Sequence, residues 1–218
     1  MSTVSGTRPK GDAYHHGDLA SALTEVATDL ARSGGPESVV LREAARRVGV
    51  SATAAYRHFA GQRDLVEAVK QRALAELAAA MRAHVDAEEP RPDRVAEGVR
   101  RVRAIGRAYI EYSLDEAGLF RTAFCPPEPD DTVDAMEEMV AQSAPYRMLS
   151  EALDDLVAAG ALGPERRPYA EVRLWATVHG LALLMLDGPL RSVPDEARTM
   201  LIESTLDFCL DGLRVSSD

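Results

Sequence analysis

Hydrophobic residues recur along nearly the whole chain at the three- and four-residue spacing of amphipathic helices. Leu19, Leu23 and Leu30, for example, share one face of a helix that ends at the run Ser33-Gly34-Gly35-Pro36. No segment alternates apolar and polar residues for long enough to form a sheet. The pattern predicts an all-α protein.

Turn residues divide this pattern into further helices. After the first helix we expect a short helix over 41–48 that Gly49 stops, and a second one that Ser51 caps and that runs to about Phe59. A long helix then opens at Gly61 and reaches about residue 85. Beyond it the pattern predicts helices over 95–112 and 117–124, two pieces within 131–160 with Pro145 near a helix start, and two closing helices that begin at Pro168 and Pro194.

Composition places the chain among soluble globular proteins. It has 218 residues, of which 46% are hydrophobic and 28% charged, and it contains no run of 18 apolar residues. The first 14 residues lack the apolar core of a secretory signal, so we expect a cytoplasmic protein without a membrane partner. Cys125 and Cys209 lie far apart and neither belongs to a CxxC pair, which excludes a disulfide framework and a cysteine zinc site.

Charge is unevenly distributed. The formal net charge is −10, yet residues 1–70 carry nine Lys and Arg against eight Asp and Glu. Within them, residues 38–63 hold five arginines and one acid. A local basic patch on an acidic body suits a protein that reads one short DNA segment and repels DNA elsewhere.

Residues 41–59 carry the most informative motif. Two short helices joined at Gly49 form a helix-turn-helix pattern, in which glycine takes the tight turn and Val50 fills the gap between the helices. Ala44 and Ala45 are small where the two helices must approach closely. The second helix begins with small side chains that can enter the major groove and reach base edges without a steric clash.

Together with Tyr14-His-His-Gly-Asp-Leu19 before it and residues 59–65 after it, this motif resembles the DNA-binding domain of the TetR family, over roughly residues 14–72. The resemblance implies a dimeric repressor whose third helix enters the major groove and whose C-terminal helices bind a small molecule. It implies that residue 59 belongs to the core. The residues that it places near bases or phosphates are Arg42, Arg46, Ser51, Ala52, Thr53, Ala54, Tyr56, Arg57, His58 and Gln62.

Two positions depart from the family pattern. Val40 stands where a Ser or Thr usually caps the second helix and touches a phosphate, so the cap could fall on Ser38 instead, while Glu43 keeps the other half of a capping box. Gln62 stands where a lysine commonly opens the fourth helix. The loss of that charge would release one fewer counterion on DNA binding, unless Arg63 compensates.

The N-terminal arm, residues 1–13, is expected to be flexible. Its cations Arg8 and Lys10 could contact the minor groove or the DNA backbone. An inert tail is the alternative.

A second motif, Trp175-Ala-Thr-Val-His179-Gly180, resembles the Trp-His-Gly type of C-terminal domain found in a subset of these regulators. Trp175 and His179 share one helical face, so a ring contact or an indole N–H bond is expected. Gly180 in mid-helix suggests that another backbone passes close by. His179 is either a ligand contact or pH-sensitive group, or all three residues serve dimer or core packing.

The C-terminal part, residues 73–218, is expected to bind an effector. Aromatic and thioether side chains would give a mostly apolar pocket, although such residues at helical spacing also form ordinary cores. The pocket candidates are Tyr109, Tyr112, Phe120, Phe124, Met136, Met139, Met148, Trp175 and His179.

No catalytic, nucleotide-binding or metal-binding motif appears, so we expect no enzyme, no cofactor and no metal. The sequence thus predicts a homodimer, joined through its last two helices, that binds a pseudo-palindromic operator in double-stranded DNA. Its effector is unidentified. A regulator that binds DNA without a ligand, or an activator, is the alternative.

Overall fold

The computed structural model describes residues 16–126 and 141–213, and every regular element in these ranges is helical. This confirms the predicted all-α class. Two single 3-10 turns, Pro36–Ser38 and Pro164–Arg166, accompany the α-helices. The α-helices are α1 (His16–Gly34), α2 (Leu41–Val48), α3 (Ala52–Ala55), α4 (Gln62–Ala87), α5 (Arg94–Asp115), α6 (Ala117–Ala123), α8 (Ala144–Ala158), α9 (Ala170–Leu186) and α10 (Asp195–Leu213).

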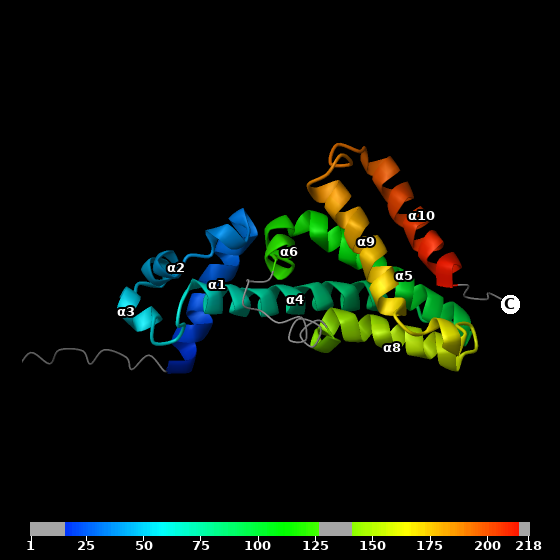
Figure 1. Ribbon diagram of the computed structural model, residues 1–218, viewed down its shortest axis with the longest axis horizontal. Coiled ribbons are helices and arrows are strands. Elements are labelled where there is room, and N and C mark those ends of the chain that lie inside the picture. The colour runs from blue at the N-terminus through cyan, green and yellow to red at the C-terminus, as the bar shows by residue number, and fades with distance from the viewer. Residues whose placement is uncertain (1–15, 127–140, 214–218) are drawn as a thin grey trace, which may run out of the picture.

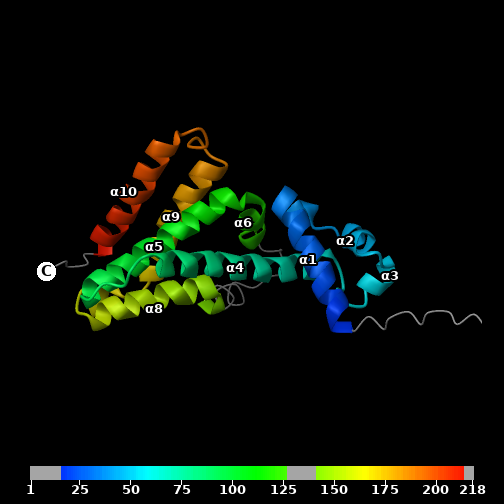
Figure 2. The same ribbon diagram turned by 180° about the vertical axis from the view of Figure 1, so that it is seen from behind.

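Helices α1, α2 and α3 gather at one end of the elongated protein, around the beginning of α4 (Figures 1 and 2). Their contacts are built by apolar side chains on the predicted inner faces, among them the fully buried Leu23 of α1 and Leu65 of α4. This unit holds the predicted helix-turn-helix.

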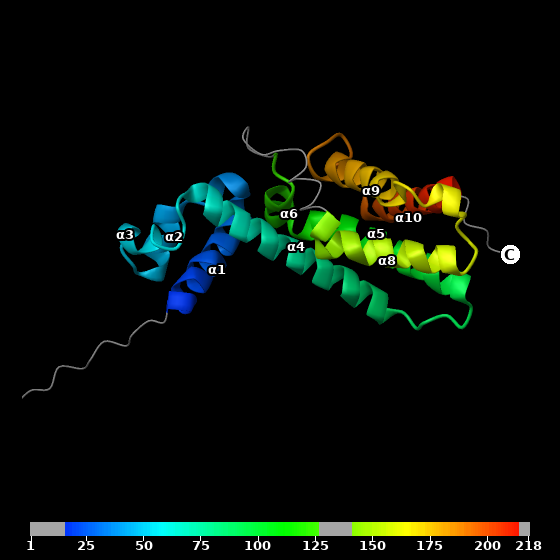
Figure 3. The same cartoon turned by 60° about the horizontal axis from the view of Figure 1, so that its bottom comes forward.

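Helix α4 runs from this unit along the other helices (Figure 3). It opens after Gly61, as predicted, and ends at Ala87, two residues beyond the expected end. Its inner stripe, which includes Val69, Ala73 and Leu77, is fully buried. The expected domain boundary at residue 72 therefore falls inside a continuous helix, so α4 belongs to both halves.

The larger half is built around α5. Helix α5 packs against α4, α8, α9 and α10, and the fully buried Ile110, Leu153 and Leu156 mark its core. Gly98 lets α5 approach α8, because a Cβ atom there would lie less than 3.0 Å from the Leu156 side chain. Figure 1 shows α9 and α10 as a pair that leans away from α4.

Besides the end of α4, the end of α3 and the start of α9 differ from those predicted. The α-helical part of α3 ends at Ala55, because the following N–H groups of Arg57 and His58 bond three residues back and tighten the chain into a turn. Helix α9 begins at Ala170 rather than Pro168, since Tyr169 has a left-handed φ of 61°. Pro145 lies in the first turn of α8, as expected, whereas the other piece predicted within 131–160 falls largely outside the described residues.

Among the described helices, none is long and apolar enough to cross a membrane.

Candidate DNA-binding surface and ligand cavity

The turn between α2 and α3 has the predicted geometry. Gly49 adopts a left-handed φ of 82°, and its N–H donates to the carbonyls of Ala45 and Arg46. The N–H of Val50 also donates to the Ala45 carbonyl at 3.0 Å. Ala44 and Ala45 are buried where α2 packs on its neighbours, so their small size permits the close approach. The turn therefore sets α3 across α2 as in a helix-turn-helix.

The start of α3 is capped by a side chain. Ser51 accepts a hydrogen bond from the Ala54 N–H through its Oγ at 3.2 Å, which confirms the predicted N-cap. Ala54 and His58 are half-buried, and Phe59 lies in the core as expected. The other predicted contact residues are exposed to solvent: Arg42, Arg46, Ser51, Ala52, Thr53, Tyr56, Arg57 and Gln62.

Two arginines on α2 are paired with one carboxylate. Arg46 donates to both oxygens of Glu43 at 2.8 Å, and Arg47 Nε donates to Oε1 at 2.9 Å. These bonds lower the pKa of Glu43 to about 2. The Glu43 carboxylate therefore pairs with two arginines and does not form the predicted half of a capping box.

The first turn of α2 has no side-chain cap. Val40 is its N-cap residue, with extended φ and ψ and no side-chain hydrogen bond. The alternative cap at Ser38 is wrong, because Ser38 ends the preceding 3-10 turn and Val40 already supplies the first helical carbonyl, to the Ala44 N–H. At the start of α4, Asp64 accepts the Ala60 N–H at 2.8 Å, so an acid already lies beside the N-terminal turn where a phosphate was expected.

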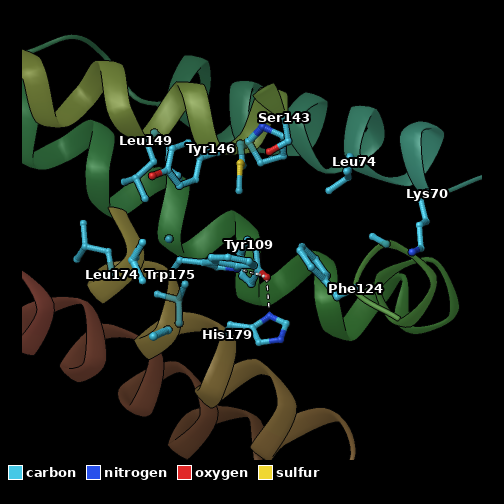
Figure 4. A pocket seen from close by; sticks show the side chains of 18 of the residues that line it. Lys70, Leu74, Tyr109, Phe124, Ser143, Tyr146, Leu149, Leu174, Trp175 and His179 are labelled. Carbon is cyan, nitrogen blue, oxygen red and sulfur yellow. Dashed lines mark hydrogen bonds between the residues drawn. The ribbon is translucent and has the colours of Figure 1, made fainter. Parts of the chain in front are cut away.

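A cavity of about 960 Å³ lies in the larger half (Figure 4). It is bounded by α4, α5, the end of α6, the start of α8, and α9 and α10, and it extends along α4 to the first turn of that helix. Its walls are mainly apolar: they include Leu74, Met81, Val102, Ile105, Phe124, Leu149, Leu174, Trp175, Val178 and Leu206.

The predicted pocket residues separate into three groups. Tyr109, Phe124, Trp175 and His179 line the cavity. Tyr112, Phe120 and Met148 lie behind its wall. Met136 and Met139 lie outside the described residues.

Tyr112, Phe120 and Met148 are turned away from the cavity. The Tyr112 ring is buried between α5 and α4, with its hydroxyl donating to the Ala73 carbonyl at 3.4 Å. Phe120 is fully buried behind Tyr109 and Phe124, with ring centroids 5.4 and 4.8 Å away. Met148 lies between α8 and α4, where its sulfur is 3.9 Å from Arg82. These side chains serve as core that supports the cavity wall.

Three of the lining side chains form a hydrogen-bonded cluster. The indole N–H of Trp175 donates to the Tyr109 hydroxyl at 3.0 Å, and that oxygen lies 2.7 Å from Nδ1 of His179. An indole nitrogen can only donate, so the Tyr109 hydroxyl accepts from Trp175. Among the described residues, its own proton can reach only Nδ1 of His179, to which the hydroxyl therefore donates. The predicted contact between Trp175 and His179 is also present, with ring centroids 5.9 Å apart.

Burial sets the protonation of this cluster. It lowers the pKa of His179 and raises the pKa of Tyr109 far above its ordinary value of 10. A neutral His179 that accepts at Nδ1 carries its proton on Nε2. His179 therefore offers one N–H donor besides its bond to Tyr109.

Sequence reasoning missed the part of the cavity along α4. Val66, Lys70 and Leu74 line it at successive four-residue steps, and Arg63, Asp64 and Glu67 lie at the same end. The four-residue spacing of Val66, Lys70 and Leu74 was the only sequence signal for this part of the cavity, but the same spacing is typical of an ordinary helix face in a packed core.

Helices α9 and α10 carry exposed apolar side chains: Leu183, Leu184, Met200 and Phe208, besides Val172, which also lines the cavity. Gly180 lies on α9, and a Cβ atom there would meet no atom within 4 Å. The close backbone predicted for Gly180 is therefore not found within the described part of this chain.

Within residues 16–126 and 141–213, no group of three or more His, Cys, Asp or Glu side chains is arranged to hold a metal ion.

Sequence comparison identifies both halves. Residues 23–69 match the family model described as bacterial regulatory proteins, tetR family, and residues 102–208 match the model of a tetracyclin repressor-like C-terminal domain. No curated protein matches the chain.

Solved structures resemble the chain over nearly its full length. A protein of unknown function from Rhodococcus sp. RHA1 is 25% identical, with a TM-score of 0.72, over 93% of this chain and 99% of that one. The TetR family transcriptional regulator PfmR from Thermus thermophilus is 17% identical, with a TM-score of 0.56, over 90% and 96%. A TetR variant from Acinetobacter baumannii AYE in complex with minocycline is 20% identical, with a TM-score of 0.51, over 95% and 100%.

The last two likenesses concern the fold, whereas the two family models together match more than half of the residues. The helix-turn-helix at residues 41–59 lies within the first model, and most of the helices around the cavity lie within the second. The chain belongs to the TetR family and is a DNA-binding transcriptional regulator rather than an enzyme.

Proposed function

We propose that this regulator is a dimeric repressor, released from a pseudo-palindromic operator by a small, mostly apolar ligand. The observation that carries the proposal is the cavity of about 960 Å³, which falls in the usual range of small-molecule sites and is walled largely by apolar side chains. A regulator that needed no ligand would gain stability by packing this space. The cavity thus favours the ligand-dependent alternative.

On the DNA side, we propose that α3 enters the major groove. Ser51, Ala52, Thr53 and Ala54 would face bases or adjacent phosphates. Tyr56, Arg57, His58 and Gln62 would contact the DNA backbone, as would Arg42 and Arg46 on α2. The Arg46–Glu43 pair is exposed, and such pairs are weak, so Arg46 can exchange its carboxylate for a phosphate at little loss.

We propose that two copies associate through α9 and α10. Met200 and Phe208 are 72% and 70% exposed, which is unusual for large apolar side chains and marks a surface that a partner covers. In a two-fold dimer the same face of both copies would meet, giving four helices at the interface. The small Gly180 would then admit the partner helix, which explains a mid-helix glycine with no neighbour in its own chain.

Ligand and DNA would be coupled through α4 and α6. Helix α4 lines the cavity at Lys70 and Leu74, and it begins shortly after the helix-turn-helix. Helix α6 ends beside the cavity at Phe124, while its Gly118 packs against the backbone of Ala31 and Arg32 in α1. A ligand that favours another position of these helices would change the spacing of the two recognition helices, which must be about 34 to 36 Å for successive grooves.

Three finer assignments stay predictions. They are the Trp-His-Gly type of C-terminal domain, a domain boundary near residue 72 and action in the cytoplasm. The packing of Trp175 on His179 supports the first assignment. Because α4 is continuous across residue 72, a domain boundary there would be a point where the helix changes its packing partners, with no linker between the domains.

Selection of DNA sites from a random library by the purified protein, followed by salt titration of the selected site, tests the proposal. We expect a pseudo-palindrome bound at least about 10³-fold more tightly than random DNA. Absence of any motif, with only weak salt-sensitive binding, would contradict it.

Two variants separate the proposed roles on the selected site. Tyr56→Ala should weaken binding to all sequences by a similar factor, because a phosphate contact carries no base information. Thr53→Ala should mainly relax base preference at one position. Equal losses for Thr53→Ala on selected and random DNA would contradict its role in base recognition.

A further inference from the structure

We propose that the cavity takes an amphipathic organic carboxylate, whose anionic group is bound by Lys70. The proposal rests on the proposed function, since it names the chemical class of the effector. It follows from the charges and hydrogen-bond donors that the cavity wall presents.

Lys70 is a largely buried cation with a poor partner. Its side chain is 13% exposed and lines the cavity. Among the described residues, the carboxylate nearest to Nζ is that of Glu67, one turn earlier, at 4.0 Å, too far for a hydrogen bond. The other oxygen of Glu67 accepts from Gln71 at 2.9 Å, and the Glu67 side chain is 47% exposed. An ammonium group removed from water is unfavourable unless hydrogen-bonded acceptors replace its hydration.

The surroundings of Lys70 favour an apolar molecule with one charged end. Figure 4 shows Lys70 reaching from α4 into the region of Leu74 and Phe124, both of which line the cavity. Among the described residues, the other charged groups that line this end are Arg63, Asp64 and Glu67, so these four side chains together carry no net charge. The site is therefore suited to a single carboxylate at Lys70 rather than to a multiply charged anion.

A second donor lies farther along the same cavity. His179 accepts from Tyr109 at Nδ1 and carries its proton on Nε2, and among the described residues Tyr109 is its only hydrogen-bond partner. Lys70 Nζ and His179 Nε2 are both donors. A ligand that supplies acceptor oxygens complements them, whereas an amine would place donor against donor.

Three amphiphiles with the same chain length test the charge preference: decanoate and decylamine below their micelle concentrations, and 1-decanol below its solubility limit. Trp175 is the only tryptophan in the chain and lines the cavity, so its fluorescence reports binding directly. We expect decanoate to bind about 10-fold more tightly than decanol, since a charge-assisted hydrogen bond is worth at least one such factor. Equal affinities, or tighter binding of decylamine, would overturn the proposal.

Lys70→Met removes the charge and keeps a long apolar side chain. The variant should bind decanoate about 10-fold more weakly and should bind decanol with unchanged affinity. Arg72→Met, on the outer face of the same helix, is the matched control and should alter neither affinity. Decanoate binding that is insensitive to Lys70→Met would also overturn the proposal, and decanol binding shows that the variant has folded.

Release of the selected operator, measured in the same samples, separates this inference from the proposed function. Decanoate that binds through Lys70 without releasing DNA upholds the ligand class and contradicts ligand-controlled repression. Decanol that binds as tightly as decanoate and releases DNA upholds the function and overturns the ligand class.

Discussion

His179 illustrates how burial decides the chemistry of a single side chain. The sequence indicated that it shares a helical face with Trp175, and the rings do meet. Its hydrogen-bond partner, however, is Tyr109, which lies 70 positions away in the chain. No local pattern could identify this partner, because the contact depends on how α5 packs against α9.

The lowered pKa of His179 predicts a pH-dependent stability. Below the ordinary value of 6.5, the unfolded chain takes up a proton that the folded chain resists. The free energy of unfolding should therefore be fully retained above pH 6.5 and should fall as the pH drops toward the pKa of the folded state. His179→Gln keeps an acceptor for Tyr109 but does not titrate. In urea denaturation, wild type should lose stability relative to this variant between pH 7.5 and 5.5; a constant difference would contradict the lowered pKa.

The two short helices of the DNA-binding unit differ in how they begin. Ser51 caps α3 with its side chain, whereas Val40 leaves the first turn of α2 without a side-chain cap. The sequence predicted both features, because a cap depends on residues only three positions apart. It left the Ser38 alternative open, since the preceding 3-10 turn ending at Ser38 was not foreseen.

A hydroxyl at position 40 should stabilise α2. Val40 is exposed and already extended, so Val40→Ser loses little buried surface and can accept a backbone N–H of the first turn. We expect the free energy of unfolding to rise by about 1 kcal/mol in urea denaturation. Val40→Ala is the control for lost side-chain volume and should not show the gain. A Ser variant no more stable than the Ala variant would refute the role of the cap.

Helix α6 lies against the backbone of α1. A Cβ atom at Gly118 would come within 3.0 Å of the carbonyl oxygens of Ala31 and Arg32. Arg32 also pairs with Glu116 just before α6 and with Glu76 of α4 at 3.0 Å. Helix α1 is thus held by α4 and α6, both of which also line the cavity.

Gly118→Ala should push α6 and α1 apart. Because backbone atoms cannot give way as a flexible side chain does, we expect a loss of about 1 to 3 kcal/mol in the free energy of unfolding. Gly212→Ala, in a helix where a Cβ atom meets nothing within 4 Å, is the matched control and should not destabilise the protein. Similar stabilities of the two variants in urea denaturation would show that the contact between α6 and α1 is loose.

The complete protein combines a locally basic DNA-binding end with an acidic body and an exposed apolar face on α9 and α10. The sequence indicated these features in part: counting gave the charge asymmetry, and the family resemblance implied that the last two helices would form a dimer interface. From the sequence alone, the exposed apolar side chains of the proposed dimer face could not be distinguished from core residues, because the distinction depends on how α9 and α10 pack.

A charge in that face should prevent association. Phe208→Glu places a carboxylate on a 70% exposed position, so the monomer should fold while the dimer is disfavoured. We expect a monomer by light scattering at concentrations where wild type is dimeric, and loss of high affinity for the pseudo-palindrome. Val40→Glu, in the DNA-binding unit, should leave the oligomeric state unchanged. A Phe208→Glu protein that remains dimeric would place the interface elsewhere.

Helix identity, the Gly49 turn and the Ser51 cap were predictable because each depends on residues within one or two helical turns. The cavity was not, because a 3.6-residue pattern shows which side of a helix faces inward but not whether that side meets another side chain or empty space. Of the predicted pocket residues, Tyr112 and Phe120 therefore lie in the core, whereas Tyr109 and His179 line the cavity. The position of Lys70 in the cavity wall could not be predicted either, because the burial of its charge depends on helices that are distant from α4 in the sequence.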